Sequence, residues 1–275
     1  QPARSAEEPA IKILISVDIE GVAGVYHPEQ TRAGNPEYER ARRLMTAEAN
    51  AAITGAFDGG ASQVYVNDSH GGFRNLPPDL LDARAEVIQG KPRYLSMVAG
   101  VELGVDALVC IGYHGRAQGR GILAHTINSF AFARISLNGV ELGEMGIYGA
   151  LAGAYGVPVV AASGDDVFID EHQALFPATR FVQVKRAHGA HSGESLSPER
   201  ACAAIREGVT QALAQAQPAP PLRFEGPVTV DLIAQSPALA DLFCQWPTLE
   251  RISGNALRFA APDTARAVDR TWIAG

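Results

Sequence analysis

The stretch Ile11-Lys12-Ile13-Leu14-Ile15-Ser16-Val17 is rich in β-branched and other apolar residues and ends at Asp18. A strand with one face in water alternates apolar and polar residues, whereas a strand covered on both faces is apolar almost throughout. This run therefore predicts a strand buried on both faces, which is typical of a parallel sheet packed between two layers of helices.

Outward from this strand, helices and strands alternate along the chain. Asn35 suits a helix N-cap, Pro36 suits the first turn, and Gly59-Gly60 end a helix whose apolar residues recur at helical spacing. Further elements are expected as strands at 63–66, 107–111, 158–162 and 181–184, and as an alanine-rich helix at 197–217. The alternation predicts an α/β fold with a mostly parallel sheet sandwiched by helices.

The last part of the chain is expected to form a second, smaller unit. Pro218-Ala219-Pro220-Pro221 is the best linker in the sequence. Beyond it, strands and helices are expected at 227–233, 236–244, 256–260 and from 262 onward. We therefore divide the chain into a main α/β domain over 10–217, which carries the metal-binding residues, and a small C-terminal α+β domain over 222–275.

A β-hairpin is expected in the middle of the chain. A weakly alternating run at 130–137 meets Asn138-Gly139, which is a strong hairpin signal.

The composition limits the class of protein. Of the 275 residues, 47% are hydrophobic and 19% are charged, which excludes a disordered chain. Asp and Glu number 30 against 23 Lys and Arg, and this net charge of −7 argues against a nucleic-acid-binding protein, which needs a basic face. No uninterrupted apolar run reaches the roughly 18 residues of a membrane span, so no membrane partner is expected.

The cysteines and the start of the chain bear on its location. Cys110, Cys202 and Cys244 are widely spaced and form no Cys-x-x-Cys pair, which favours reduced thiols over disulfides or a thiolate zinc site. A cytoplasmic protein is the expectation. Because the chain begins at Gln1 and not at a methionine, a removed leader and export stay open.

Side chains that bind metals follow three of the predicted strands. Asp18 and Glu20 come after the first strand, His70 after the second and His114 after the third. Parallel sheets bind ligands beyond the carboxyl ends of their strands, and two carboxylates that flank one residue point the same way in an extended segment. Two carboxylates with two imidazoles suit zinc, or manganese or cobalt. Each side chain alone also fits a plainer role, a turn cap for Asp18 or a hydrogen-bonded core residue for either histidine.

Several short motifs in register extend this pattern. They read Ser16-Val17-Asp18-Ile19-Glu20-Gly21-Val22-Ala23-Gly24, Met45-Thr46-Ala47-Glu48-Ala49-Asn50, Val66-Asn67-Asp68-Ser69-His70, Gly112-Tyr113-His114 and Gly143-Glu144. In their order and separations the chain resembles the zinc-dependent D-aminopeptidases of the DppA type, nearly without gaps through about residue 200. The tail after Pro221 resembles that family only loosely.

The resemblance implies two zinc ions per chain and a set of five ligands. These would be Asp18, which would bridge both ions, with Glu20, His70, His114 and Glu144. Glu144 enters the set only through the resemblance, because a glutamate in a predicted helix also fits an exposed helix face. The resemblance further implies a catalytic histidine at His125, a small peptide or amide substrate, and assembly into a homo-oligomer that can be a large ring.

The chemistry expected of this set is hydrolysis of an amide bond, most simply by an aminopeptidase that acts on short D-amino-acid peptides. Two divalent ions held roughly 3.5–4 Å apart activate a water and polarise the scissile carbonyl. His125 lies outside the metal set, so we expect it to transfer a proton or to stabilise the oxyanion, although the family's histidine has been described as a nucleophile. The loop at 115–121 is expected to be mobile and basic, and Asp68 either to bind the substrate's amine or to cap the next turn.

Two other classes of function stay open at this stage. A two-metal hydrolase of a non-peptide amide, a lactone or a phosphate ester would use similar ligands, but the chain has no phosphate-cradling GxxxxGK[ST] loop. A non-enzymatic metal-binding protein would be expected to have lost Glu144 or His125, and both are present. His188-Gly189-Ala190-His191 has metal-like spacing but falls in a predicted polar loop, and Asp165-Asp166 is expected to cap a helix.

Overall fold

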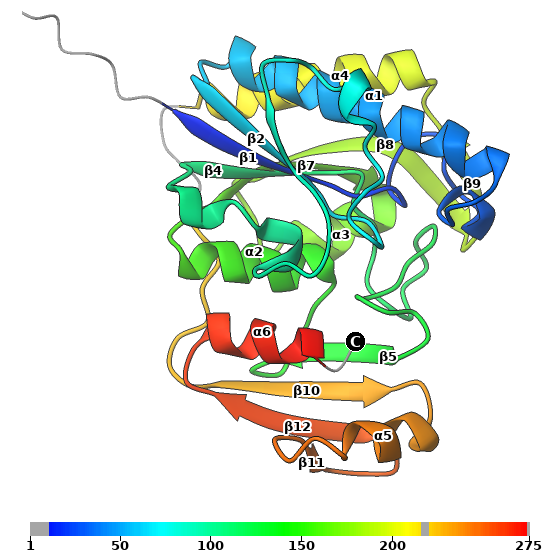
Figure 1. Ribbon diagram of the computed structural model, residues 1–275, viewed down its shortest axis with the longest axis vertical. Coiled ribbons are helices and arrows are strands. Elements are labelled where there is room, and N and C mark those ends of the chain that lie inside the picture. The colour runs from blue at the N-terminus through cyan, green and yellow to red at the C-terminus, as the bar shows by residue number, and fades with distance from the viewer. Residues whose placement is uncertain (1–10, 216–219, 274–275) are drawn as a thin grey trace, which may run out of the picture.

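The computed structural model describes residues 11–215 and 220–273 and is centred on a seven-stranded sheet (Figure 1). The strands follow the order β3-β2-β1-β4-β7-β8-β9, and all neighbours are parallel except β8 and β9, which form an antiparallel hairpin. Their bounds are β1 (Lys12–Val17), β2 (Gln63–Asp68), β3 (Glu86–Ile88), β4 (Ala107–Ile111), β7 (Val159–Asp165), β8 (Arg180–Gly189) and β9 (Ser192–Ser195). As the sequence predicts, β1 lies between two parallel neighbours and is buried from Ile13 to Val17.

Helices cover both faces of this sheet. α1 (Pro36–Asp58) and α4 (Pro198–Leu213) pack side by side on one face, and α2 (Glu144–Ala154) and α3 (Asp166–His172) lie on the other (Figure 1). α1 begins where the sequence predicts, because the Asn35 side chain accepts a hydrogen bond from the Tyr38 amide at 3.0 Å. The mostly parallel sheet sandwiched by helices is therefore confirmed. Short 3-10 helices lie in the loops, at η1 (Pro28–Gln30), η2 (Pro78–Leu80), η3 (Ser96–Val98) and η4 (Val101–Leu103).

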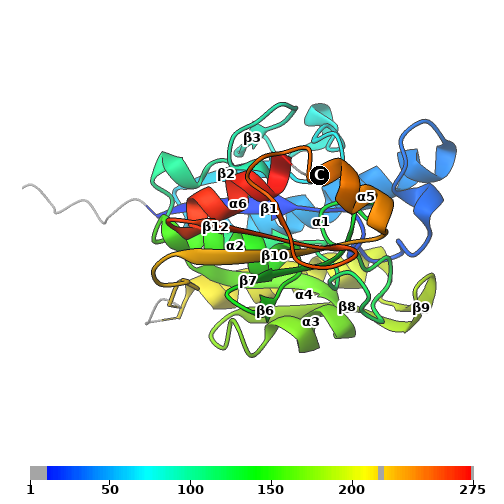
Figure 2. The same ribbon diagram turned by 90° about the horizontal axis from the view of Figure 1, so that it is seen from below.

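A second, five-stranded antiparallel sheet lies beyond α2. Its order is β11-β12-β10-β5-β6. Figure 2 shows the molecule from below, so that this second sheet faces the viewer. The bounds are β5 (Phe132–Leu137), β6 (Val140–Glu141), β10 (Val228–Ala234), β11 (Glu250–Arg251) and β12 (Ala256–Ala261), with helices α5 (Pro237–Phe243) and α6 (Thr264–Ile273). α6 packs against α2 on one side and against β10 and β12 on the other. One apolar core therefore runs from Leu14 of the main sheet through Met145 of α2 to Val230 of the second sheet.

The two sheets do not divide the chain where the proline-rich stretch does. The predicted hairpin at Asn138-Gly139 exists, but its strands belong to the second sheet, where Ile135 of β5 lies opposite Leu232 of β10. The small unit expected over 222–275 is thus completed by strands from the middle of the 10–217 range. Of the predicted linker, residues 218 and 219 lie outside the described residues, as do Gln1 and residue 10.

Within residues 11–215 and 220–273, no helix is both long enough and apolar enough to cross a membrane.

Candidate metal centre

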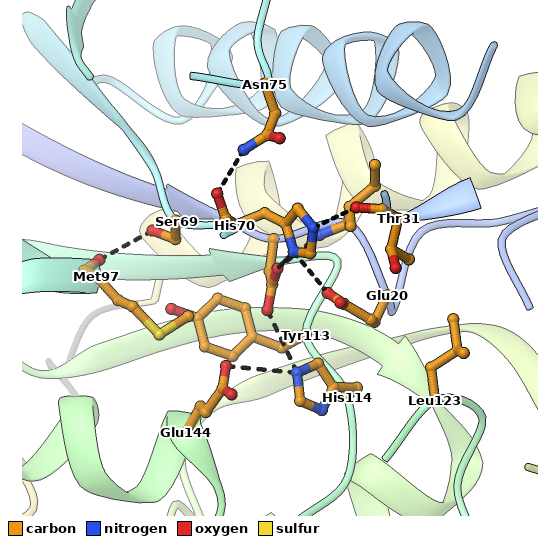
Figure 3. Close-up of polar contacts among 12 residues, drawn as sticks. Glu20, Thr31, Ser69, His70, Asn75, Met97, Tyr113, His114, Leu123 and Glu144 are labelled. Carbon is orange, nitrogen blue, oxygen red and sulfur yellow. Dashed lines mark hydrogen bonds and ion pairs between the residues drawn. The ribbon is translucent and has the colours of Figure 1, made fainter. Parts of the chain in front are cut away.

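The carboxyl ends of three neighbouring strands meet at one edge of the main sheet. The register pairs Val17, the last residue of β1, with Asp68 at the end of β2 and with Ile111 at the end of β4. The segments that follow these residues carry the ligands predicted from the strand ends. Glu144, the first residue of α2, reaches the same place from the other side (Figure 3).

Buried hydroxyl groups tie these strand ends together beneath the site. The Ser16 hydroxyl lies 2.6 Å from the Ser69 hydroxyl and 2.7 Å from the Tyr113 hydroxyl, and it donates to the Met97 carbonyl at 2.6 Å. All four residues are buried. Because hydrogen bonds between buried groups have few alternatives, this cluster fixes the spacing of the segments that carry the histidines.

The predicted ligands converge around Asp18. Asp18 Oδ1 lies 3.2 Å from His70 Nδ1, and Asp18 Oδ2 lies 3.4 Å from His114 Nε2. Glu20 Oε2 lies 3.1 Å from the same His70 nitrogen, and Glu144 Oε2 lies 3.4 Å from the same His114 nitrogen (Figure 3). The two oxygens of Asp18 thus face two different halves of the site, one with Glu20 and His70 and one with His114 and Glu144.

Backbone carbonyls fix which nitrogen of each histidine faces the site. A carbonyl can only accept a hydrogen bond, so the ring nitrogen beside it carries a proton, and in the neutral ring the other nitrogen presents a lone pair. The pairs are His70 Nε2 with the Thr31 carbonyl (2.8 Å), His114 Nδ1 with the Gly115 carbonyl (2.9 Å) and His125 Nδ1 with the Leu123 carbonyl (2.9 Å). Sequence reasoning missed these partners, because a backbone carbonyl has no residue-type signature.

The atoms that face one another fit a bound cation. Within the described part of the chain, Glu20 Oε2 and His114 Nε2 are buried without a hydrogen-bond partner. Burial raises the pKa of Asp18, and the neighbouring Glu20 carboxylate raises it further. Burial by itself would lower the pKa of His70, but Glu20 and Asp18 outweigh it, so this pKa lies well above its usual value. The field inside the site therefore favours positive charge, and carboxylate oxygens with imidazole nitrogens are ligands that zinc accepts.

His125 lies beside this cluster. Its ring stacks on the His114 ring with centroids 4.2 Å apart and planes 11° apart. His125 Nε2 lies 3.6 Å from Glu144 Oε1, and that same oxygen accepts a hydrogen bond from the Ile127 amide at 2.8 Å. Ligand atoms of His114, His125 and Glu144 lie within 4.8 Å of one another, as do those of Asp18, Glu20 and His114. The structure thus brings all six predicted site residues together.

Comparison with known proteins agrees with this arrangement. A model of peptidase family M55, described as D-aminopeptidase, matches residues 11–272. The chain belongs to this family. A D-aminopeptidase of Bacillus subtilis strain 168 is 34% identical over 212 residues, which cover 77% of each chain. A solved structure described as the Zn-dependent D-aminopeptidase DppA from Bacillus subtilis, a self-compartmentalizing protease, superposes with a TM-score of 0.93 over 96% of each chain at 29% identity.

This M55 peptidase is therefore a metal-dependent aminopeptidase, that is, a hydrolase of peptides. The resemblance inferred from the sequence motifs is confirmed, and the structural match extends it over nearly the whole chain, including the tail that resembled the family only loosely.

Hydrogen bonds to carboxylates anchor the loop at 115–121, which the sequence predicts to be mobile and basic. The Arg116 amide donates to Glu171 Oε2 at 2.8 Å, and the Ile122 amide donates to Asp165 Oδ2 at 2.7 Å. The Arg116 side chain is paired with carboxylates, at 3.0 Å from Glu171 and 3.2 Å from Glu141. Its charge is therefore compensated by the protein itself.

Other polar residues singled out in the sequence have structural partners. Asp68 accepts hydrogen bonds from both the backbone and the side chain of Asn75 and from the Leu76 amide, so it anchors the loop after β2 and is not free for a substrate amine. Asp165 caps α3, as predicted, by accepting from the Phe168 amide at 2.8 Å. His188 pairs with Glu194 across the β8–β9 hairpin at 3.2 Å, where the sequence suggested a polar loop.

Two cavities meet at His125 of the peptidase. An inner cavity of about 130 Å³ is lined by metal-site residues together with the apolar side chains of Phe73, Met97 and Tyr148. An outer cavity of about 270 Å³ is lined by Glu20, Arg32, His125, Phe130 and His191, among others. Phe130 is 76% exposed at this mouth. The metal cluster thus lies between a small chamber and a wider opening.

Proposed function

We propose that the peptidase binds two zinc ions, bridged by Asp18, and removes the N-terminal residue from short D-amino-acid peptides. One ion would lie with Glu20 and His70, and the other with His114 and Glu144. The observation that carries the proposal is that Asp18 turns one oxygen to each histidine, at 3.2 and 3.4 Å. The zinc dependence and D-aminopeptidase activity described for the Bacillus subtilis protein support the choice of metal and substrate.

His125 has the geometry of a group that moves protons. Bound zinc ions would supply Lewis acidity toward the scissile carbonyl and lower the pKa of an attacking water. His125 Nδ1 is committed to the Leu123 carbonyl, so Nε2 is free to accept a proton from that water and to return it to the leaving amine. Its stacking on His114 keeps this nitrogen beside the metal cluster.

The two cavities suit the two sides of a peptide bond. A cleaved N-terminal residue has one side chain to place, and the inner cavity of about 130 Å³ offers a small space with apolar side chains in its wall. The rest of the peptide would extend through the outer cavity of about 270 Å³ toward solvent. This arrangement would limit cleavage to one residue from a free N-terminus.

Elemental analysis and a substrate screen test the proposal together. Purified, zinc-loaded protein should hold close to two ions per chain, and chelation should abolish hydrolysis of D-aminoacyl amides. L-Aminoacyl amides are the matched control for stereochemistry. Full activity with one ion or none would refute the two-ion site, and equal turnover of both enantiomers would refute the D-preference.

We also propose that the chain forms a homo-oligomer, in keeping with the self-compartmentalizing description of the structural relative. Large apolar side chains on the surface support this, notably Leu242 (60% exposed), Trp246 (49%) and Ile252 (45%). Light scattering coupled to size-exclusion chromatography would measure the assembly, and a monomer at micromolar concentration would contradict it.

A further inference from the structure

The segment from Ile19 to Val25, which follows β1 and carries Glu20, is held by two ionisable side chains from distant parts of the chain. Lys185 of β8 donates from Nζ to the Glu20 carbonyl and to the Val25 carbonyl, each at 2.6 Å. Glu48 of α1 accepts from the Ala23 amide at 2.8 Å through Oε1. Lys185 is only 3% exposed and Glu48 only 2%, so both hydrogen bonds lie in the interior.

Charged side chains in these positions are costly. Burial lowers the pKa of Lys185 to about 8, although Asp165, Glu48 and Glu20 around it act in the opposite direction. Replacing buried ion pairs by apolar residues of similar size is often neutral or stabilising, so packing alone gives no reason for an ammonium group here. What the ammonium provides is a pair of hydrogen bonds to the backbone of the 19–25 segment.

That backbone determines where the Glu20 carboxylate lies. The Glu20 carbonyl faces Lys185, while the side-chain atom Oε2 lies 3.1 Å from His70 Nδ1. Within the described residues, the Glu20 carboxylate accepts no backbone hydrogen bond like the one from the Ile127 amide that holds Glu144, so its position follows from the main chain. The Asp18 amide donates to the Ile111 carbonyl at 2.8 Å and the Gly21 amide to the Gly112 carbonyl at 2.7 Å, so the main chain on either side of Glu20 is also tied to the end of β4.

We propose that Lys185 and Glu48 are positioning residues that set the metal affinity of the Glu20–His70 half of the site. This inference rests on the two-ion function proposed above. The other half depends on different supports, the Gly115 carbonyl for His114 and the Ile127 amide for Glu144. Lys185 and Glu48 therefore act on one ion and leave the second in place. Residues that orient metal ligands typically contribute about 10–100-fold to metal affinity.

The test measures zinc affinity, with chelator competition on the full chain to resolve the two dissociation constants. Lys185→Met keeps the apolar stem and removes the ammonium; we expect one dissociation constant to rise about 10–100-fold and the other to stay at the wild-type value. Glu48→Gln keeps an oxygen for the Ala23 amide and should bind zinc nearly as the wild type does. Val184→Ala, a buried neighbour on β8, is the control for general loss of core stability.

Double variants identify the affected half. Adding Lys185→Met to His70→Ala should cause no further loss of zinc, whereas adding it to His114→Ala should weaken the ion that is left. The absorption spectrum of cobalt-loaded protein gives a second readout, since only the bands of one ion should change. If Lys185→Met does not fold, Glu48→Ala takes its place, because it removes the acceptor for the Ala23 amide.

Two results would overturn the inference while the two-ion function stands. One is a wild-type pair of dissociation constants in Lys185→Met, and the other is equal weakening of both ions to the extent seen in Val184→Ala. A wild-type protein that binds a single ion would refute the two-ion function instead. Even then, an unchanged affinity for that ion in Lys185→Met would overturn the positioning role. A weaker affinity in Lys185→Met, with a wild-type affinity in Val184→Ala, would support it.

Discussion

Replacing His125 by alanine separates the chemistry of the site from its metal binding. In the wild type, the His125 ring is 21% exposed, donates one hydrogen bond to the Leu123 carbonyl and stacks on His114. The loss of that bond and of the stacking contact should lower the free energy of unfolding by about 1–2 kcal/mol. The proposed ligands are all retained, so we expect the zinc content to stay near that of the wild type.

The effect on turnover should be much larger than the effect on stability. General acid–base catalysis is typically worth about 10²–10⁴-fold, which corresponds to about 3–5 kcal/mol of activation free energy. We therefore expect kcat to fall by that factor in His125→Ala with little change in KM. His114→Ala is the matched comparison, because the two rings are stacked but only His114 is assigned as a ligand, and it should lose metal and activity together.

The assay combines elemental analysis, thermal unfolding and steady-state kinetics on both variants and the wild type. Loss of zinc from His125→Ala as complete as that from His114→Ala would show that His125 is a ligand. This is the main alternative to the proton-transfer role, because His125 Nε2 lies 3.6 Å from Glu144 Oε1. A raised KM with unchanged kcat would instead assign His125 to holding the loop. Either result would refute the proton-transfer role.

Three further predictions concern the frame of the site. Asp18→Ala should lose both ions in elemental analysis, because each carboxylate oxygen serves one half; retention of either ion at full occupancy would contradict bridging. Gly21→Ala should lose zinc affinity and thermal stability, since a Cβ there would lie 1.9 Å from the Tyr113 carbonyl oxygen, and a wild-type melting temperature would refute this. Burial lowers the pKa of His172 to about 4. Unfolding therefore takes up a proton between about pH 6.5 and 4, and stability should fall in that window as pH drops, by up to about 1.4 kcal/mol per pH unit. Urea titrations of apo-protein should show a shallower fall for His172→Gln, and identical pH profiles would contradict the assignment.

The ligands at strand ends could be read from the sequence because their signal is local. An apolar run followed within a few residues by a carboxylate or a histidine marks the end of a buried strand, and the rule for parallel sheets places such ends at one edge. Asp18 and His114 follow this logic directly, and β1 and β4 are indeed neighbours. Glu144 could not be found in this way, because its place depends on how the β5–β6 hairpin turns the chain back toward the sheet.

The pairing of strands in the second sheet could not be predicted either, because it also depends on contacts between distant parts of the chain. The hairpin at Asn138-Gly139 was predicted from its turn, but nothing in the sequence says that β5 pairs with β10, almost a hundred residues later. The short strands β3, β9 and β11 were missed as well, since two to four residues give too little pattern to recognise. Pairing between distant strands is decided by the shared core that they bury, which a single sequence does not display.

The two halves of the metal site depend on different parts of the fold, and this has a consequence for residues far from it. Glu20 belongs to a segment held from α1 and β8, whereas His114 and Glu144 are held by groups within a few residues of β4 and by the Ile127 amide. A change inside α1 or β8 therefore reaches one half without touching a ligand. A change at the edge of the sheet reaches both halves, because Asp18 serves both. Glu48 and Lys185 are polar residues at buried positions where packing would favour apolar ones, and their hydrogen bonds to the 19–25 segment give the reason for their presence.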